Sequence, residues 1–546
     1  MFRRLEQIEY RFDLYIWDIA RETLAVVKAG YPSTIVRLLK LIEYEELCDS
    51  PSGEDSYKAV KGYRIKYFDV LREKIIADMN HIYTENQRVL RDVLPCLSSV
   101  VDELTIVHDE VTPLFPQNYN ILNFFVLEYH RAIYDLINRM TVDDIDPADI
   151  LLLTKWVRDY YASMGSRLGV TEDLLEPRLL DGREDELICN YVKLVRTKLA
   201  EWLVNIMHSE TLEFLERKIS PETDANGQFL LTGSVIIFQM FNQQLDIVST
   251  ASYGQLIADV INECCEVLNS FQNGWMHVLD SEYSRFVSRA ADMPQGLVEY
   301  TIALGNDCVR SAEFGEAFIL RIEGFITAQS CLSEVVDKVK ASLEGFMKLS
   351  RRTHQILVDI VISDVSAAFK VMHCDAWYDQ DVLRLILGTF EDYSDDFIKH
   401  MSEYLFNKIT TELIEKFLVL YLDSFRNKNA KFKMPIASER IRNDIEKCVN
   451  YFSKIKTPKR VLVYFESVRK VVALLDSNPR MIYLDFHSLW RAFPDISLDY
   501  VEKVLSKRDD LDKSQLKELI ETCKSRLKDE VIEEFQPTVF SKLYTK

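Results

Sequence analysis

The chain has 546 residues, of which 48% are apolar and 28% charged, and its formal net charge at neutral pH is −20. This length exceeds what one hydrophobic core supports, so three or four domains are expected. A net charge of this sign argues against non-specific nucleic-acid binding, and we expect no nucleic-acid partner. Only 16 glycines and 14 prolines are present. Because β-sandwiches and parallel α/β folds need many tight turns, this scarcity predicts an all-α fold of long helices.

The cysteines and the apolar runs predict a soluble, cytosolic protein. None of the ten cysteines has CxxC spacing, which favours reduced, buried thiols over a disulfide framework. The chain opens with a charged, helix-like stretch rather than a signal peptide. No apolar run approaches the ~18–20 residues that span a bilayer.

The first part of the chain is predicted to form helices separated by proline-containing breaks. At one break Asp143, Asp144, Asp146 and Asp149 surround Pro147, which resembles a Ca²⁺-binding loop. The spacing lacks the glycine and the final glutamate of an EF-hand loop. A helix-capping turn is therefore the favoured interpretation.

Residues 220–248 combine a polar turn with an amphipathic helix. The turn contains Pro221, Asp224 and Gly227, which restrict φ, cap backbone amides and tolerate a positive φ, respectively. Four apolar residues then recur at steps of three and four, which predicts one buried helix face. They are Phe238, Phe241, Leu245 and Val248.

Similar stripes follow at 357–372, 406–420 and 461–475, and Ser497 and Asp512 are predicted helix N-caps. No fixed period of 30–47 residues marks a solenoid. We therefore expect an elongated rod of tandem helical bundles, with bundles at 1–150, 151–395 and 396–546.

No catalytic chemistry is predicted from the motifs. HExxH, GxSxG and P-loop patterns are absent. The His373-Cys374-Asp375 trio is interpreted as a helix end with a buried thiol rather than a metal site, and Cys264-Cys265 as core and boundary positions rather than a redox pair. We therefore predict a protein that is not an enzyme, with no catalytic, cofactor-binding or metal-binding residues.

The one electrostatic feature is a basic segment between residues 426 and 470, with thirteen Lys or Arg against four Asp or Glu. Three interpretations stay open: a solvated link beside acidic helices, which we favour; a surface for an acidic partner; and weak contact with an anionic membrane. The candidate binding residues are Arg426, Lys428, Lys431, Lys433, Arg440, Arg442, Lys454, Lys456, Lys459 and Arg460.

Three stretches of the chain resemble the Sec-six family, the third component of the exocyst. They are the turn and helix of 221–248, the run 151–165 with Leu168-Gly-Val170, and the run 187–202 between Leu187 and Trp202. The resemblance covers most of the chain in order and spacing. It rests on structural residues, because the family has no catalytic motif.

The resemblance implies a fold and a set of partners. Family members are tandem helical bundles of the CATCHR tethering class and act in the exocyst, which docks secretory vesicles at the plasma membrane before SNARE-mediated fusion. The implied partners are the other exocyst subunits, notably Sec-eight, together with plasma-membrane SNAREs and Sec/Munc regulators. The implied location is cytoplasmic and peripheral, at sites of secretion on the plasma membrane.

The resemblance has one departure, at the start of the chain. The family usually carries an N-terminal coiled coil that pairs with Sec-eight, whereas this chain opens in what resembles the first bundle. The alternatives are another tether subunit of the COG, GARP or Dsl complexes, a Munc-thirteen-like rod, or a helical module that binds anionic lipid through residues 426–470.

Overall fold

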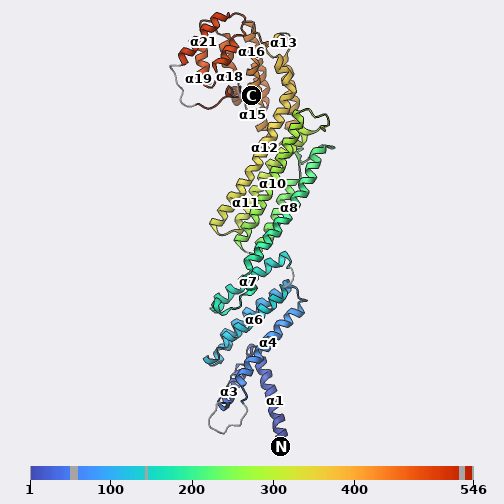
Figure 1. Ribbon diagram of the computed structural model, residues 1–546, viewed down its shortest axis with the longest axis vertical. Coiled ribbons are helices and arrows are strands. Elements are labelled where there is room, and N and C mark those ends of the chain that lie inside the picture. The colour runs from blue at the N-terminus through green and yellow to red at the C-terminus, as the bar shows by residue number, and fades with distance from the viewer. Residues whose placement is uncertain (1, 50–59, 142–144, 252, 528–534, 544–546) are drawn as a thin grey trace. The chain divides into compact units, whose positions relative to one another are not determined.

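The protein is almost entirely helical (Figure 1), as the scarcity of glycine and proline predicted. The computed structural model describes residues 2–49, 60–141, 145–251, 253–527 and 535–543. The chain divides into two compact units. Unit 1 comprises residues 1–199, 242–263 and 324–332, and unit 2 comprises 200–241, 264–323 and 333–546. The all-α bundle prediction is confirmed, and the division into three bundles stays a prediction.

Unit 1 is a stack of helices around one core, in which α5 packs on α7 and α4 on α6. Its α-helices are α1 (Phe2–Arg21), α2 (Thr23–Lys28), α3 (Pro32–Asp49), α4 (Tyr63–Glu85), α5 (Leu90–Ile106), α6 (Ile121–Met140) and α7 (Pro147–Leu168). Short π and 3₁₀ turns connect them: η1 (Val107–Val111), η2 (Thr112–Leu114), η3 (Gln117–Tyr119), η4 (Glu172–Leu174) and η5 (Leu179–Gly182).

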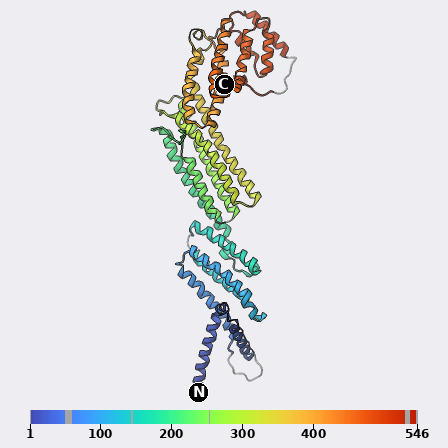
Figure 2. The ribbon, with the colours of Figure 1, turned by 180° about the vertical axis from the view of Figure 1, so that it is seen from behind.

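Five long helices contribute residues to both units. They are α8 (Glu184–Glu216), α9 (Gly233–Ser249), α10 (Gly254–Val287), α11 (Leu297–Phe325) and α12 (Gln329–Val371). In unit 2, the corresponding parts of α8, α10, α11 and α12 run side by side (Figures 1 and 2). Gln272 on α10 donates to the Ser342 carbonyl on α12 at 2.9 Å, which ties two of them together.

The remainder of unit 2 is a cluster of mostly shorter helices. They are α13 (Asp375–Asp379), α14 (Val382–His400), α15 (Glu403–Ser424), α16 (Ile436–Ile455), α17 (Pro458–Tyr464), α18 (Glu466–Asp476), α19 (Ile482–Ala492), α20 (Leu498–Leu505), α21 (Lys513–Leu527) and the 3₁₀ turn η6 (Ser541–Leu543). The predicted caps are confirmed. Ser497 accepts from the Tyr500 amide at 3.1 Å, and Asp512 and Gln515 form a reciprocal capping box.

The turn before α9 is a small hairpin that the sequence did not predict. Strands β1 (Glu222–Thr223) and β2 (Phe229–Leu230) pair antiparallel. Asp224 accepts from the amides of Asn226 and Gln228, both at 2.9 Å, and Gly227 has φ +82°. The predicted apolar face of α9 is confirmed, since all four of its residues are at most 3% exposed: Phe238, Phe241, Leu245 and Val248.

Candidate functional site

The ten predicted basic residues form two groups at opposite ends of α16. Because α16 has 20 residues, its ends lie ~30 Å apart. The loop cluster lies in the α15–α16 link and the first turns of α16; the junction cluster lies where α16 meets α17. The loop cluster is Arg426, Lys428, Lys431, Lys433, Arg440 and Arg442. The junction cluster is Lys454, Lys456, Lys459 and Arg460.

In the link itself, most of the loop cluster is committed to contacts within the protein. Arg426 pairs with Asp423 at 2.6 Å and donates to the Leu543 carbonyl at 3.0 Å. Lys431 and Lys433 approach the two oxygens of Asp375 at 3.5 and 4.0 Å. Lys428 is exposed. These contacts tie the link to α13 and to the C-terminal segment, which is a structural role.

The two arginines at the start of α16 are also engaged. Arg440 donates to the carbonyl oxygens of Tyr378 and Gln380 at 2.9 and 2.8 Å, and its guanidinium lies 5.1 Å from the Trp377 ring centre. Arg442 forms an ion pair with Asp476. The loop cluster therefore has little uncompensated charge.

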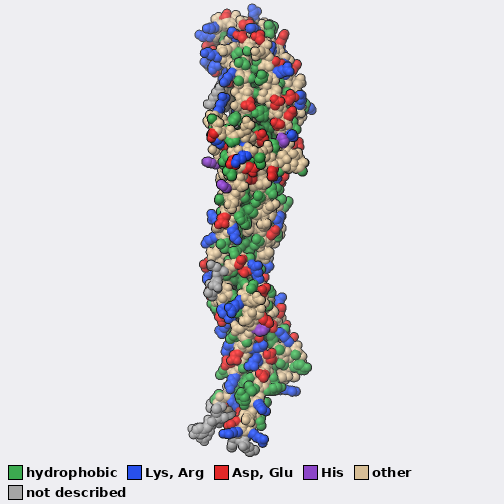
Figure 3. Space-filling view, turned by 90° about the vertical axis from the view of Figure 1, so that its right-hand side faces the viewer, with side chains coloured by type: hydrophobic (Ala, Val, Ile, Leu, Met, Phe, Trp, Pro, Cys, Tyr) green, Lys and Arg blue, Asp and Glu red, His purple; other side chains and the backbone are tan. Residues whose placement is uncertain are grey.

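The junction cluster differs, because most of its charges lack an acidic partner among the described residues. Lys454 pairs with Glu391 at 3.2 Å. The Lys456 ammonium contacts two neutral oxygens, the Thr411 hydroxyl and, at 3.5 Å, the Asn407 carbonyl. Lys459 and Arg460 are exposed. Figure 3 shows cations and anions interspersed over the upper part of the face in view, so net charge alone does not mark a patch.

The other residue groups singled out in the sequence have structural roles, although Cys374 is only half-buried, so the prediction of a buried thiol there is wrong. His373 is fully buried and hydrogen-bonds Ser424 at 2.9 Å, and burial lowers the pKa of its imidazole to about 3. Cys264 and Cys265 are both buried, at 2% and 1% exposed, so the prediction of core positions is confirmed for one of them and the prediction of a boundary position for the other is wrong. Within the described ranges, no group of three or more His, Cys, Asp or Glu side chains is placed to hold a metal ion.

The acidic cluster around Pro147 caps a helix, as predicted. Asp146 accepts from the Ala148 amide at 2.9 Å at the N-terminus of α7, and Asp149 pairs with Arg91 at 2.5 Å. Asp143 and Asp144 lie outside the described residues.

A buried carboxyl pair in unit 2 was not predicted from the sequence. Glu210 on α8 accepts from the amides of Thr232 and Gly233 at 3.0 and 2.5 Å, and Asp307 on α11 accepts from the Ser234 hydroxyl at 2.5 Å. Burial, together with the nearby Asp307, raises the pKa of Glu210 to about 8, and burial raises that of Asp307 to about 7. The pair holds the start of α9 against two neighbouring helices.

The Glu210 site explains the glycine that begins α9. A Cβ at position 233 would clash with the Glu210 carboxyl group, so Gly233 permits the close approach. Little in the local sequence indicates this contact, because the flanking Thr232 and Ser234 are ordinary N-cap residues. The glycine between them is the one local signal.

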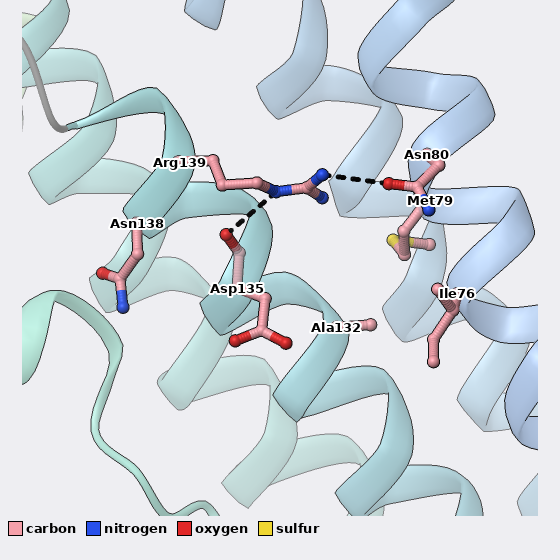
Figure 4. Close-up of a pocket in the computed structure, with 7 residues that line it drawn as sticks. All are labelled: Ile76, Met79, Asn80, Ala132, Asp135, Asn138 and Arg139. Atoms are coloured by element: carbon pink, nitrogen blue, oxygen red, sulfur yellow. Dashed lines mark hydrogen bonds between the residues drawn. The ribbon is translucent and has the colours of Figure 1, made fainter.

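A cleft of about 510 Å³ lies between α4 and α6 in unit 1 (Figure 4). Arg139 crosses it, donating to the Asn80 side chain at 3.0 Å and to the Asp135 carbonyl at 3.3 Å. Ile76, Met79 and Ala132 supply an apolar wall. No nucleophile–base pair is present among the lining residues, which are Ile76, Met79, Asn80, Ala132, Asp135, Asn138 and Arg139. The cleft is a helix–helix contact bridged by an arginine, without catalytic geometry.

Solved structures with the same fold define the class of protein. The crystal structure of the C-terminal domain of the exocyst subunit Sec6p aligns with a TM-score of 0.60 at 19% identity, covering 67% of this chain and 98% of that one. The crystal structure of M-Sec aligns with a TM-score of 0.65 at 12% identity, covering 97% of this chain and 89% of that one. This chain therefore has the helical-bundle fold that these two structures share.

Sequence comparisons identify the family. The family model described as "Exocyst complex component Sec6" matches residues 2–513. The chain is 28% identical to exocyst complex component sec6 of Schizosaccharomyces pombe, over 99% of this chain and 75% of that protein. It is 22% identical to SEC6 of Saccharomyces cerevisiae, over 89% of this chain and 64% of that protein.

The chain therefore belongs to the Sec6 family of exocyst complex components. The predicted resemblance to the Sec-six family is confirmed, and with it the prediction of a non-catalytic tethering subunit rather than an enzyme. No helix among the described residues is long and apolar enough to cross a lipid bilayer.

Proposed function

We propose that the chain works as a scaffold within the assembled exocyst, cytoplasmic and peripheral at sites of secretion on the plasma membrane, where it helps to hold vesicles before SNARE-mediated fusion. Membership of the Sec6 family supports this role. The structural observation that carries it is an exposed apolar stripe on α1, which offers a surface for assembly with a sister subunit.

The stripe consists of Ile8, Phe12 and Tyr15, which are 64%, 50% and 64% exposed. Their spacing of four and three places them on one face of α1. The same stripe continues at Ile19, which is partly buried against the unit 1 core. The first half of α1 thus presents side chains of core type without a partner inside the described chain.

A helix from another subunit fits this stripe best. Apolar residues at alternating steps of four and three form the seam of a coiled coil, where a second helix covers them. Large exposed apolar surfaces of this kind mark interaction sites. We assign the stripe to Sec-eight, the sister subunit that the family implies.

Co-purification tests this assignment. The variant Ile8→Asp, Phe12→Asp, Tyr15→Asp places three charges in the seam, and we expect it to recover about tenfold less of the other exocyst subunits from host cells, because buried unpaired charges oppose association. The matched control is Tyr44→Asp, Leu47→Asp, Ile65→Asp, three exposed apolar residues of unit 1 outside the stripe. Equal recovery with the two variants would contradict the assignment.

We assign the remaining implied partners, plasma-membrane SNAREs and Sec/Munc regulators, to exposed surfaces of unit 2. The basic residues of the junction cluster favour this unit, since several of them lack acidic partners in the described ranges. Weak contact of segment 426–470 with an anionic membrane is the second candidate, supported by the exposure of Lys428, Lys459 and Arg460.

A further inference from the structure

The cations at the junction of α16 and α17 form part of a larger surface that includes the start of α15. Lys456 reaches from the end of α16 to Asn407 and Thr411 on α15. Lys408 lies beside them on α15, 5.3 Å from the Tyr404 ring centre. We call the following set the junction surface: Lys408, Lys456, Lys459, Arg460 and the apolar Val463.

The charge of this surface is not neutralised within the described part of the protein. Burial lowers the pKa of Lys456, and the nearby Arg460 and Lys408 lower it too, while Glu415 raises it. Glu415, the acid that faces this group, is already paired with Lys542 at 2.5 Å. Like charges therefore face one another with little compensation, and an added anion would stabilise all of them.

The junction surface also offers apolar contact area. Val463 on α17 is 74% exposed, one turn after Lys459 and Arg460, and its neighbour Leu462 is 38% exposed. Tyr404 is 42% exposed beside Lys408. A surface of cations around exposed apolar side chains complements a ligand that carries both carboxylates and apolar groups on one face.

The shape of the charge distribution favours a narrow ligand over a membrane. The whole chain has a net charge of −20, so a planar anionic bilayer brings its own charge close to acidic side chains as well as to the cations. A single helix is ~10 Å wide, close to the screening length of ~8 Å at physiological salt. It can therefore contact these cations while covering less of the acidic surface than a bilayer would.

We propose that the junction surface binds an acidic amphipathic helix of a partner protein. Carboxylates spaced three or four residues apart on that helix pair with the four cations, and an apolar side chain between them packs on Val463. This inference rests on the proposed function, because a scaffold subunit holds partner proteins, and it narrows the basic segment to one end of α16.

Binding of a synthetic probe to the purified full chain tests the proposal. The probe is a fluorescent, acidic amphipathic peptide of about 18 residues with Glu and Leu at helical spacing, measured by fluorescence anisotropy. The test variant is Lys456→Glu, Lys459→Glu, Arg460→Glu. The control variant is Lys428→Glu, Lys513→Glu, Lys517→Glu, which changes the net charge equally at lysines of the same unit outside the junction surface.

We expect the test variant to bind the peptide about tenfold or more weakly and the control to bind within about twofold of the parent chain. Raising the salt should weaken parent binding. Equal losses in both variants, or no loss in either, would overturn the proposal.

A second readout separates a protein ligand from a lipid surface. The same variants are sedimented with vesicles of phosphatidylcholine and phosphatidylserine at about 3:1. Vesicle binding that depends on the junction surface, with peptide binding unchanged, would also overturn the proposal and assign the surface to a membrane. Recovery of exocyst subunits with the α1 variant reports on the proposed function separately, so the two can fail independently.

Discussion

Two of the buried carboxyl sites in unit 2 differ in the charged groups next to them. Glu282 on α10 is 1% exposed and pairs with Arg217 at 2.7 Å and Arg285 at 2.6 Å. Glu210 on α8 is 7% exposed and receives backbone amides, with Asp307 as its charged neighbour. The first site is compensated by two cations, whereas the second is held by neutral donors beside another acid.

The comparison shows that burial alone does not determine whether an acidic residue is charged. The Glu282 site depends on a buried ion pair. Removing either partner would leave the other charge unpaired and lower the free energy of unfolding. The Glu210 site instead depends on a proton, because burial and the neighbouring Asp307 raise its pKa to about 8. The basic residues at the two ends of α16 show the same contrast. The loop cluster is largely paired, whereas the junction cluster is mostly uncompensated.

The largest expected effect comes from breaking the compensated site. Glu282→Gln leaves the Arg217 guanidinium, whose side chain is 0% exposed, without its carboxylate. We expect a loss of about 3–5 kcal/mol in the free energy of unfolding, because a buried charge remains unpaired. Urea unfolding followed by intrinsic tryptophan fluorescence, to which the buried Trp275 contributes, measures it. Asp280→Asn, in an exposed pair with Arg352, is the control, with at most about 1 kcal/mol lost.

The next effect is a pH dependence at the uncompensated site. The pKa of Glu210 is raised to about 8 in the folded state, so the folded chain binds more protons than the unfolded one. The resulting stability is fully present below the ordinary carboxyl pKa and is lost as the pH rises through about 8. We expect about 4 kcal/mol less stability at pH 9 than at pH 5 from this group, measured by urea unfolding at each pH.

Two variants decide whether Glu210 causes that dependence. Glu210→Gln removes the titrating group, so its stability should vary less between pH 5 and 9 than that of the parent chain. Glu201→Gln, an exposed glutamate on the same helix, should keep the parent profile. A Glu210→Gln profile as steep as the parent's would show that another group is responsible.

The smallest effects sharpen the contrast between the two ends of α16. Arg442→Met removes one partner of the ion pair with Asp476 and should cost up to about 0.5 kcal/mol. Lys456→Met removes a partly buried charge that is disfavoured by burial and by the nearby Arg460 and Lys408, and should raise stability by a similarly small amount, because solvent screens these charges. The two changes should shift the melting temperature in opposite directions; shifts of the same sign would contradict the contrast.

Periodicity and capping made much of the helical fold predictable. The apolar faces of α9 and α15 and the caps at Ser497 and Asp512 follow from residues close in sequence. The stripe at 461–475 predicts one helix, but the structure divides it between α17 and α18 at Phe465. Phe465 keeps nearly helical angles, φ −80° and ψ −3°, so periodicity continues across the break.

The candidate sites were less predictable, because they depend on contacts between distant residues. The sequence showed the density of Lys and Arg between 426 and 470, but not that Asp375 and Asp476 neutralise one end of α16. In the sequence, Glu210 is not distinguishable from an ordinary helix residue. Its buried surroundings include Gly233 and Asp307, which come from two other helices. The two-residue strands of the hairpin are too short to give an alternating pattern.

The hairpin also bears on the order in which unit 2 is completed during synthesis. The buried Asn306 side chain donates to the carbonyl oxygens of Phe229 and His400 at 2.9 and 2.8 Å, and it accepts from the Ser402 amide at 2.9 Å. These partners are 77 to 96 residues away along the chain. Since chains emerge from the ribosome N-terminus first, the hairpin cannot acquire its full set of contacts until the segment around residue 402 has left the exit tunnel.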